Sequence, residues 1–79
     1  MPKLPSPCIG VCKFRDGGHC ITCSMTRPQK HGFRRIEGRK GRRAFLTMLT
    51  AQQELLGRYR AWAKAYRRKC EKKGAESPV

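Results

Sequence analysis

The chain has 79 residues, of which 19 are Lys or Arg and five are Asp or Glu, so its formal net charge is +14. A chain this short forms a single domain with a small core, which often needs a metal or covalent fastening. No stretch is long and apolar enough to span a bilayer. The charge imbalance favours an anionic partner, with nucleic acid the commonest and acidic protein surfaces or anionic lipid behind it.

Four of the five cysteines lie in the first third of the chain, with the spacing C-x3-C-x7-C-x2-C. The tripeptide Asp16-Gly17-Gly18 is a strong turn signal between the two pairs. The pairs are therefore predicted to lie on opposite arms of a tight loop, with their sulfurs converging. Four thiolates around a divalent cation are typical of structural zinc, and zinc binding would be coupled to folding. The predicted ligands are Cys8, Cys12, Cys20 and Cys23.

Other uses of these cysteines remain open. The N-terminal segment lacks the apolar core of a secretion signal, so we expect a cytoplasmic protein in which disulfides are disfavoured. An iron–sulfur cluster is the main alternative to zinc, because it also takes four cysteines. Thiols without metal, or a redox pair at Cys20 and Cys23, form a third reading. We expect His19 to be solvated, His31 to be exposed, and Cys70 to be a free thiol rather than a fifth ligand.

A short helix is predicted to follow the cysteine loop. Thr26 is a good N-cap, Pro28 is tolerated in the first turn, and Gln29 completes a capping box with Thr26. We expect Gly32 and then Gly38 to interrupt this helix.

An apolar stripe at helical spacing predicts a long helix over residues 44–73. Thr50 and Gln53 form a second capping-box pattern, so we expect one bent helix or two segments that break near Thr50. The aromatic residues Tyr59, Trp62 and Tyr66 lie on the stripe and are expected in the core rather than stacked on bases. The predicted fold is a small metal-stabilised, mainly α chain. It has a cysteine loop with an extended leader (1–25), a basic helical region (26–73) and a polar tail (74–79).

One family shares the cysteine motif. The stretch Ser6-Pro7-Cys8-Ile9-Gly10-Val11-Cys12, followed by Cys20-Ile21-Thr22-Cys23, resembles the small bacterial family called domain of unknown function 1289. The resemblance covers residues 6–50, with the specific motif in residues 6–23. Thr26 matches the family's Thr ahead of a short helix, whereas Phe33 stands for its usual Trp, and Arg and Lys replace its acidic residues. The resemblance implies a metal-binding module, and members are often labelled predicted iron–sulfur proteins.

Basic residues gather in two zones on either side of the apolar stripe. Eight fall in residues 27–43 and another eight in residues 58–73. Such clusters could contact phosphate with a steep salt dependence, and the Arg-rich first zone suits bidentate contacts. The predicted nucleic-acid contacts are Arg27, Lys30, Arg34, Arg35, Arg39, Lys40, Arg42 and Arg43.

Three functions compete on these features. The favoured one is a zinc-stabilised module that binds nucleic acid through Arg and Lys, with the nucleic-acid type unspecified. The alternatives are an iron–sulfur or redox accessory protein that docks an acidic partner, and an adaptor whose apolar stripe binds a protein. We do not expect an enzyme, because the chain offers no carboxylate pair, no nucleophile triad and no phosphate-cradling glycine loop.

Overall fold

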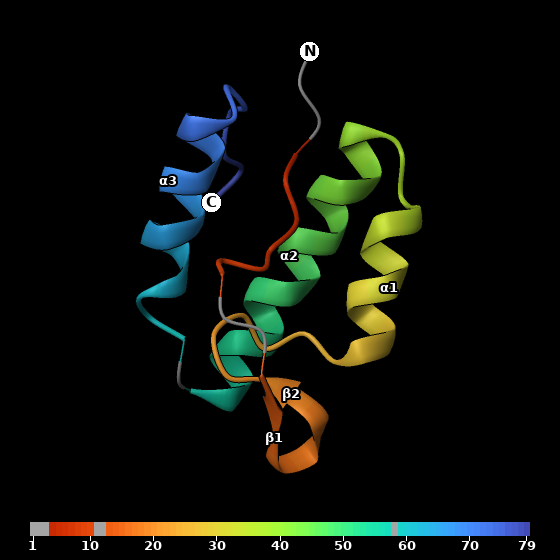
Figure 1. The fold of residues 1–79 in the computed structure, drawn as a ribbon, viewed down its shortest axis with the longest axis vertical. Coiled ribbons are helices and arrows are strands. Elements are labelled where there is room, and N and C mark those ends of the chain that lie inside the picture. Colours follow the sequence, from red (N-terminus) through yellow and green to blue (C-terminus); the bar gives the residue numbers. More distant parts are fainter. Residues whose placement is uncertain (1–3, 11–12, 58) are drawn as a thin grey trace.

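The computed structural model describes residues 4–10, 13–57 and 59–79. Within these ranges the chain forms three α-helices: α1 (Arg27–Arg35), α2 (Arg39–Leu56) and α3 (Trp62–Lys72). Consecutive helices run in opposite directions, and a small hairpin projects beyond one end of them (Figure 1). The expected small, mainly helical fold is confirmed, whereas its stabilisation by metal stays a prediction.

The hairpin lies where the turn was predicted. Strand β1 (Phe14–Arg15) pairs antiparallel with β2 (His19–Cys20), and Phe14 stands opposite Cys20. A 3-10 turn over Asp16–Gly18 joins the strands, with φ of 77° at Gly17. Residues with a side chain rarely adopt this left-handed backbone conformation, so glycine at this position allows the tight reversal.

Helix α1 begins with the predicted capping box. The backbone N–H of Gln29 donates to Thr26 Oγ1 at 3.3 Å, and the N–H of Thr26 donates to Gln29 Oε1 at 2.9 Å. Gly32 lies inside the helix and does not interrupt it, since the helix ends at Arg35. Phe33 is buried and makes an edge-to-face contact with Phe45 of α2, with ring centroids 5.2 Å apart.

Helix α2 differs from the prediction at both ends. It begins at Arg39, so most of the predicted basic stretch before residue 44 is helical. Thr50 lies within the helix, where its hydroxyl donates to the carbonyl of Thr47 at 2.9 Å, and the predicted break near Thr50 is wrong. The helix ends instead at Gly57, whose φ of 75° and hydrogen bond to the Gln53 carbonyl form a left-handed C-cap. Glycine adopts this cap geometry with the least strain, which explains the position of the break.

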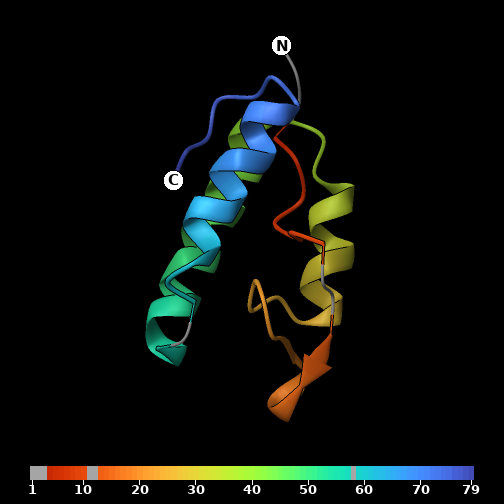
Figure 2. The same cartoon turned by 60° about the vertical axis from the view of Figure 1, so that its left-hand side comes forward.

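The core lies between the N-terminal leader (residues 4–10), α2 and α3. The leader runs against these two helices, and the view from a second side agrees (Figures 1 and 2). Trp62 and Tyr66 are 2% and 0% exposed and stack with ring centroids 5.0 Å apart. These two aromatic residues are therefore core residues, as predicted, and Tyr59 is half-buried against the same cluster.

None of the helices in the described ranges has the length and apolar character needed to cross a membrane.

Candidate metal centre and basic surface

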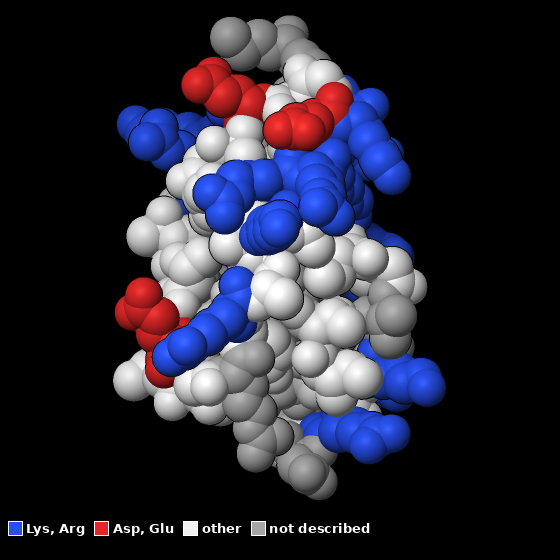
Figure 3. Space-filling view, turned by 90° about the vertical axis from the view of Figure 1, so that its left-hand side faces the viewer, with Lys and Arg blue, Asp and Glu red and all other residues white. Residues whose placement is uncertain are grey.

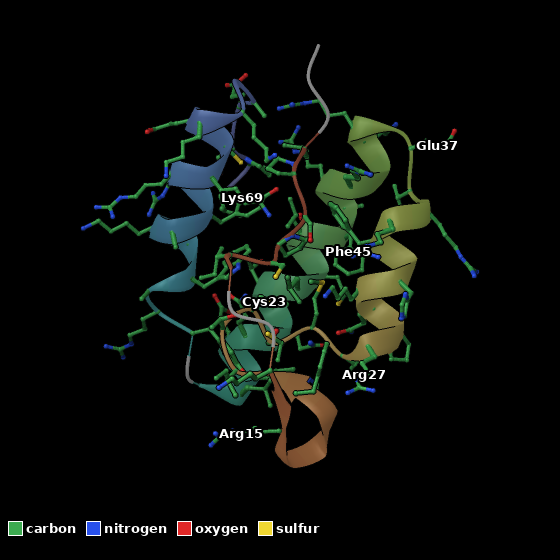
Figure 4. All side chains as sticks on the ribbon, viewed as in Figure 1. Arg15, Cys23, Arg27, Glu37, Phe45 and Lys69 are labelled. Atoms are coloured by element: carbon green, nitrogen blue, oxygen red, sulfur yellow. The ribbon has the colours of Figure 1, made fainter. Side chains whose placement is uncertain are left out.

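A tight loop after β2 brings two of the predicted ligands together. The N–H of Cys20 donates to the Met25 carbonyl at 2.8 Å, and the N–H of Ser24 donates to the Cys20 carbonyl at 3.0 Å. Ser24 takes a left-handed conformation, with φ of 71°, which closes the loop. We call residues 20–25 the cysteine knuckle. Cys20 and Cys23 are both fully buried within it. Figure 4 shows Cys23 near the middle of the molecule, beside α2.

The Cys20 sulfur is surrounded by hydrogen-bond donors. Its burial alone would raise its pKa, but hydrogen bonds from the Thr22 hydroxyl and from the backbone of Thr22 and Cys23 lower the pKa to about 7. The Thr22 Oγ1 lies 3.3 Å from the sulfur. Donors of this kind stabilise a thiolate. The knuckle is therefore organised for negative charge on Cys20.

The Cys23 sulfur carries the opposite tendency. Burial, together with the neighbouring thiols of Cys20 and Cys8, raises its pKa to about 12, against a hydrogen bond from the Met25 backbone that lowers it. A buried thiolate beside other thiolates is costly unless a cation offsets their charge. The donor set of this site thus fits a thiophilic cation such as zinc or the iron of a cluster.

The structure brings together only some of the four predicted ligands. Cys8 is half-buried on the leader, close enough to act on Cys23. Cys12 lies outside the described residues. Among the residues that the structure does describe, no three or more His, Cys, Asp or Glu side chains form a metal-binding group. The structure accordingly brings the Cys20 and Cys23 side chains together in one loop, and the four-ligand site stays a prediction.

The other candidate ligands are accounted for. His19 is half-buried rather than fully solvated, because its Nδ1 donates to the Ser24 carbonyl at 2.7 Å and packs the ring on the knuckle. His31 is exposed, as predicted, and Cys70 is a fully buried thiol outside any disulfide. That Cys70 is not a fifth ligand stays a prediction.

Side chains of α3 hold the backbone of the leader. Trp62 Nε1 donates to the Pro7 carbonyl at 2.9 Å, and the Tyr66 hydroxyl donates to the Pro5 carbonyl at 2.7 Å. Lys69 Nζ donates to the carbonyls of Ser6 and Cys8. Since proline-rich backbone cannot join a helix or sheet easily, these donors satisfy carbonyls that burial would otherwise leave unpaired. They also fix the position of Cys8.

A second set of side chains braces the knuckle. Gln53 Nε2 donates to the Cys23 carbonyl at 3.0 Å, Gln52 Nε2 to the Ser24 carbonyl at 2.8 Å, and the Tyr59 hydroxyl to the Cys20 carbonyl at 3.0 Å. The sequence does not predict this role for these residues. The sequence signal that could have indicated it is the polar pair Gln52 and Gln53 within an apolar stripe. In the structure Gln53 is only 7% exposed.

Part of the predicted basic zone lines one hollow. Between the hairpin and α1 lies an open depression of about 370 Å³, lined by Phe14, Arg27, Lys30, His31 and Arg34. The Arg27 guanidinium lies over the Phe14 ring, 5.2 Å from its centroid. We call this depression the α1 hollow. It brings together three of the predicted contact residues, which come from successive turns of α1.

The remaining predicted contacts divide into exposed and structural residues. Arg35, Lys40 and Arg43 are exposed. Arg39 donates to the Glu76 carbonyl at 3.0 Å. Arg42 is half-buried, donates to the carbonyls of Leu4 and Ile36 at 2.7 Å each, and lies over the Phe33 ring. The guanidinium of Arg42 is thus used in holding the leader and the α1–α2 connection.

These features define a small helical protein with a cysteine knuckle that is braced by α2 and by the connection between α2 and α3. The chain belongs to the family described as protein of unknown function (DUF1289), whose model matches residues 6–53. The predicted family resemblance is confirmed. The matched region ends within α2, so α3 and its contacts to the leader lie outside it. No curated protein and no solved structure matches the chain at a significant level.

Proposed function

We propose that this protein is a small cytoplasmic metal-binding module that binds nucleic acid through its basic surface, and that its role is binding rather than catalysis. The knuckle carries the metal half of the proposal, because backbone and hydroxyl donors converge on the Cys20 sulfur beside the buried Cys23. Cys8, Cys12, Cys20 and Cys23 would hold the ion. Bound zinc would supply a positive charge that fastens the leader to the hairpin.

The other residues of the site have supporting roles. Lys69 keeps the Cys8 carbonyl in place, and Gln53 and Tyr59 hold the knuckle backbone at Cys23 and Cys20. Such backbone contacts orient ligands before the ion arrives, which is how residues around a metal site commonly support it.

The α1 hollow supports the nucleic-acid half of the proposal. Arg27, Lys30 and Arg34 line it together, and the exposed Arg35, Lys40 and Arg43 extend the positive charge along α1 and α2. A phosphate backbone would release counterions on contact with these side chains, so binding would weaken steeply as salt increases.

Elemental analysis tests the metal. Protein purified without added metal should contain one equivalent of zinc and be colourless. Iron with acid-labile sulfide in a brown protein would instead establish the iron–sulfur alternative. Protein free of both metals, with a native far-ultraviolet spectrum, would contradict a metal-stabilised module.

Fluorescence anisotropy with labelled oligonucleotides tests the nucleic-acid surface. The double variant Arg27→Gln/Arg34→Gln should bind single-stranded DNA and RNA more weakly than the wild type. The matched control is Lys64→Gln/Arg67→Gln, which removes two exposed charges from α3. Equal affinity of the two double variants would remove the α1 hollow from the interface, and no salt-sensitive binding by the wild type would refute nucleic acid as the partner.

A further inference from the structure

A second hollow lies between the leader and α3, beside the candidate metal centre. Its volume is about 460 Å³, and it is lined by Cys8, Ile9, Gly10, Ala65, Arg68, Lys69 and Lys72. Three of these seven residues are cationic, and all three lie on α3. We call this depression the α3 hollow. It is separate in its lining from the α1 hollow, since the two share no residue.

Lys69 is a fixed cation in the wall of the α3 hollow. It is half-buried, and two carbonyls of the leader, those of Ser6 and Cys8, accept from its ammonium. An ammonium has three N–H donors, so one donor remains beyond the two hydrogen bonds that it makes with the described residues. Burial lowers the pKa of Lys69, whereas the neighbouring thiol of Cys8 raises it.

Arg68 and Lys72 are exposed and lie one helical turn apart, so both can reach the same bound group. Lys and Arg side chains gather over the upper part of the face that α3 presents, with acidic side chains at its upper edge (Figure 3). A guanidinium fork gives paired hydrogen bonds to phosphate, and ammonium groups add point charges. The two non-bridging oxygens of a backbone phosphodiester can together accept hydrogen bonds from all three cations.

We infer that the α3 hollow binds a backbone phosphate of nucleic acid, through Arg68, Lys69 and Lys72. The inference rests on the proposed function, because it adds a second contact to the same partner. It places this contact outside the region matched by the family model, on the helix that also holds the leader. The nucleic acid would then touch both the α1 hollow and the α3 hollow.

The test compares two α3 double variants by anisotropy with a labelled single-stranded oligonucleotide. Arg68→Gln/Lys72→Gln changes two exposed residues that line the hollow, and Lys64→Gln/Arg67→Gln changes two exposed residues of the same helix that do not. Both lose two charges, so general attraction falls equally. We expect the first variant to bind about tenfold more weakly than the second at low salt, with a smaller dependence of log K on log salt by about 0.7 for each lost contact.

Lysine acetylation followed by mass spectrometry gives a second measurement, made on the wild-type protein. A bound oligonucleotide should protect Lys72 and leave Lys64 reactive. Inorganic phosphate and poly-glutamate serve as competitors: millimolar phosphate that displaces nothing supports a backbone contact, whereas poly-glutamate that protects Lys72 equally well assigns the hollow to acidic protein and overturns the inference.

The outcomes separate this inference from the function on which it rests. If the wild type binds the oligonucleotide and the two α3 variants bind alike, the α3 hollow is not a contact and the proposed function survives. If the wild type binds no oligonucleotide, both are refuted.

Discussion

The indole Nε1 of Trp62 donates a buried hydrogen bond of 2.9 Å to the carbonyl oxygen of Pro7, one residue before the predicted ligand Cys8. This contact joins the start of α3 to the leader across 55 residues of sequence. It means that the third helix takes part in positioning the candidate metal centre. Trp62, which the apolar stripe predicts as a core residue, thus also donates a hydrogen bond that holds the leader.

The Trp62 hydrogen bond should be measurable as stability. Trp62→Phe keeps an aromatic ring in the core but leaves the buried Pro7 carbonyl without its donor. We expect the free energy of unfolding to fall by about 2 kcal/mol, including the lost ring volume. Urea unfolding followed by circular dichroism measures it. Leu55→Ala, at a side chain that is 89% exposed, is the control and should change stability by less than about 0.5 kcal/mol. Equal effects of the two variants would show that the hydrogen bond contributes nothing.

Arg42 and Arg43 are neighbours in sequence with different predicted effects. Arg42→Gln removes a guanidinium that donates to the carbonyls of Leu4 and Ile36, so we expect a loss of about 2 kcal/mol in the free energy of unfolding. Arg43→Gln changes an exposed side chain and should leave stability within about 0.5 kcal/mol. Thermal unfolding of both variants checks this pair, and an unaltered melting temperature for Arg42→Gln would contradict the structural role.

Two glycines should respond to alanine with opposite signs. Gly57 has a φ of 75° at the C-cap of α2, so Gly57→Ala should destabilise the fold by about 1 kcal/mol. Gly32 lies within α1, where an added Cβ meets nothing within 4 Å, so Gly32→Ala should stabilise the fold by about 0.5–1 kcal/mol. Denaturant unfolding of both variants measures the difference. The same sign for both changes would argue against a helix end at Gly57.

Metal binding should distinguish the knuckle thiols from the remaining buried thiol. Cys20→Ser should abolish stoichiometric metal and lower the helical circular-dichroism signal, because metal binding and folding are coupled. Cys70→Ala is the matched control, since Cys70 is equally buried but lies on α3. It should retain the full metal content, with any stability loss confined to packing. Elemental analysis of both purified variants gives the answer, and metal retained by Cys20→Ser would remove Cys20 from the ligand set.

Local patterns in the sequence predicted much of the fold. The capping box at Thr26, the turn at Asp16–Gly18 and the buried faces of Trp62 and Tyr66 all follow from short-range rules, and the structure agrees with them. The prediction of a break near Thr50 was wrong because this periodic segment contains two signals for a helix terminus. One is the capping-box pattern at Thr50, and the other is Gly57. A capping pattern inside a helix costs little, whereas a glycine in the left-handed region ends it.

The candidate site was predictable only in its chemistry. The spacing of Cys20 and Cys23 implies a knuckle, because two intervening residues allow backbone amides to reach a sulfur. Nothing local indicates that Gln53 supports Cys23 or that Lys69 holds the backbone of Cys8, because these pairs are 30 and 61 residues apart. Likewise, charge counting treats Arg42 and Arg43 alike, although one is half-buried in the fold and the other is exposed.

The sequence by itself determined the thiol-rich loop, the helical segments and the strong positive charge, because spacing, periodicity and composition act over a few residues or over the whole chain. The tertiary structure alone decided which polar side chains hold the leader and which cations line each hollow. Those choices depend on where buried carbonyls come to lie once distant segments pack, and each such carbonyl requires a donor from whichever helix is adjacent.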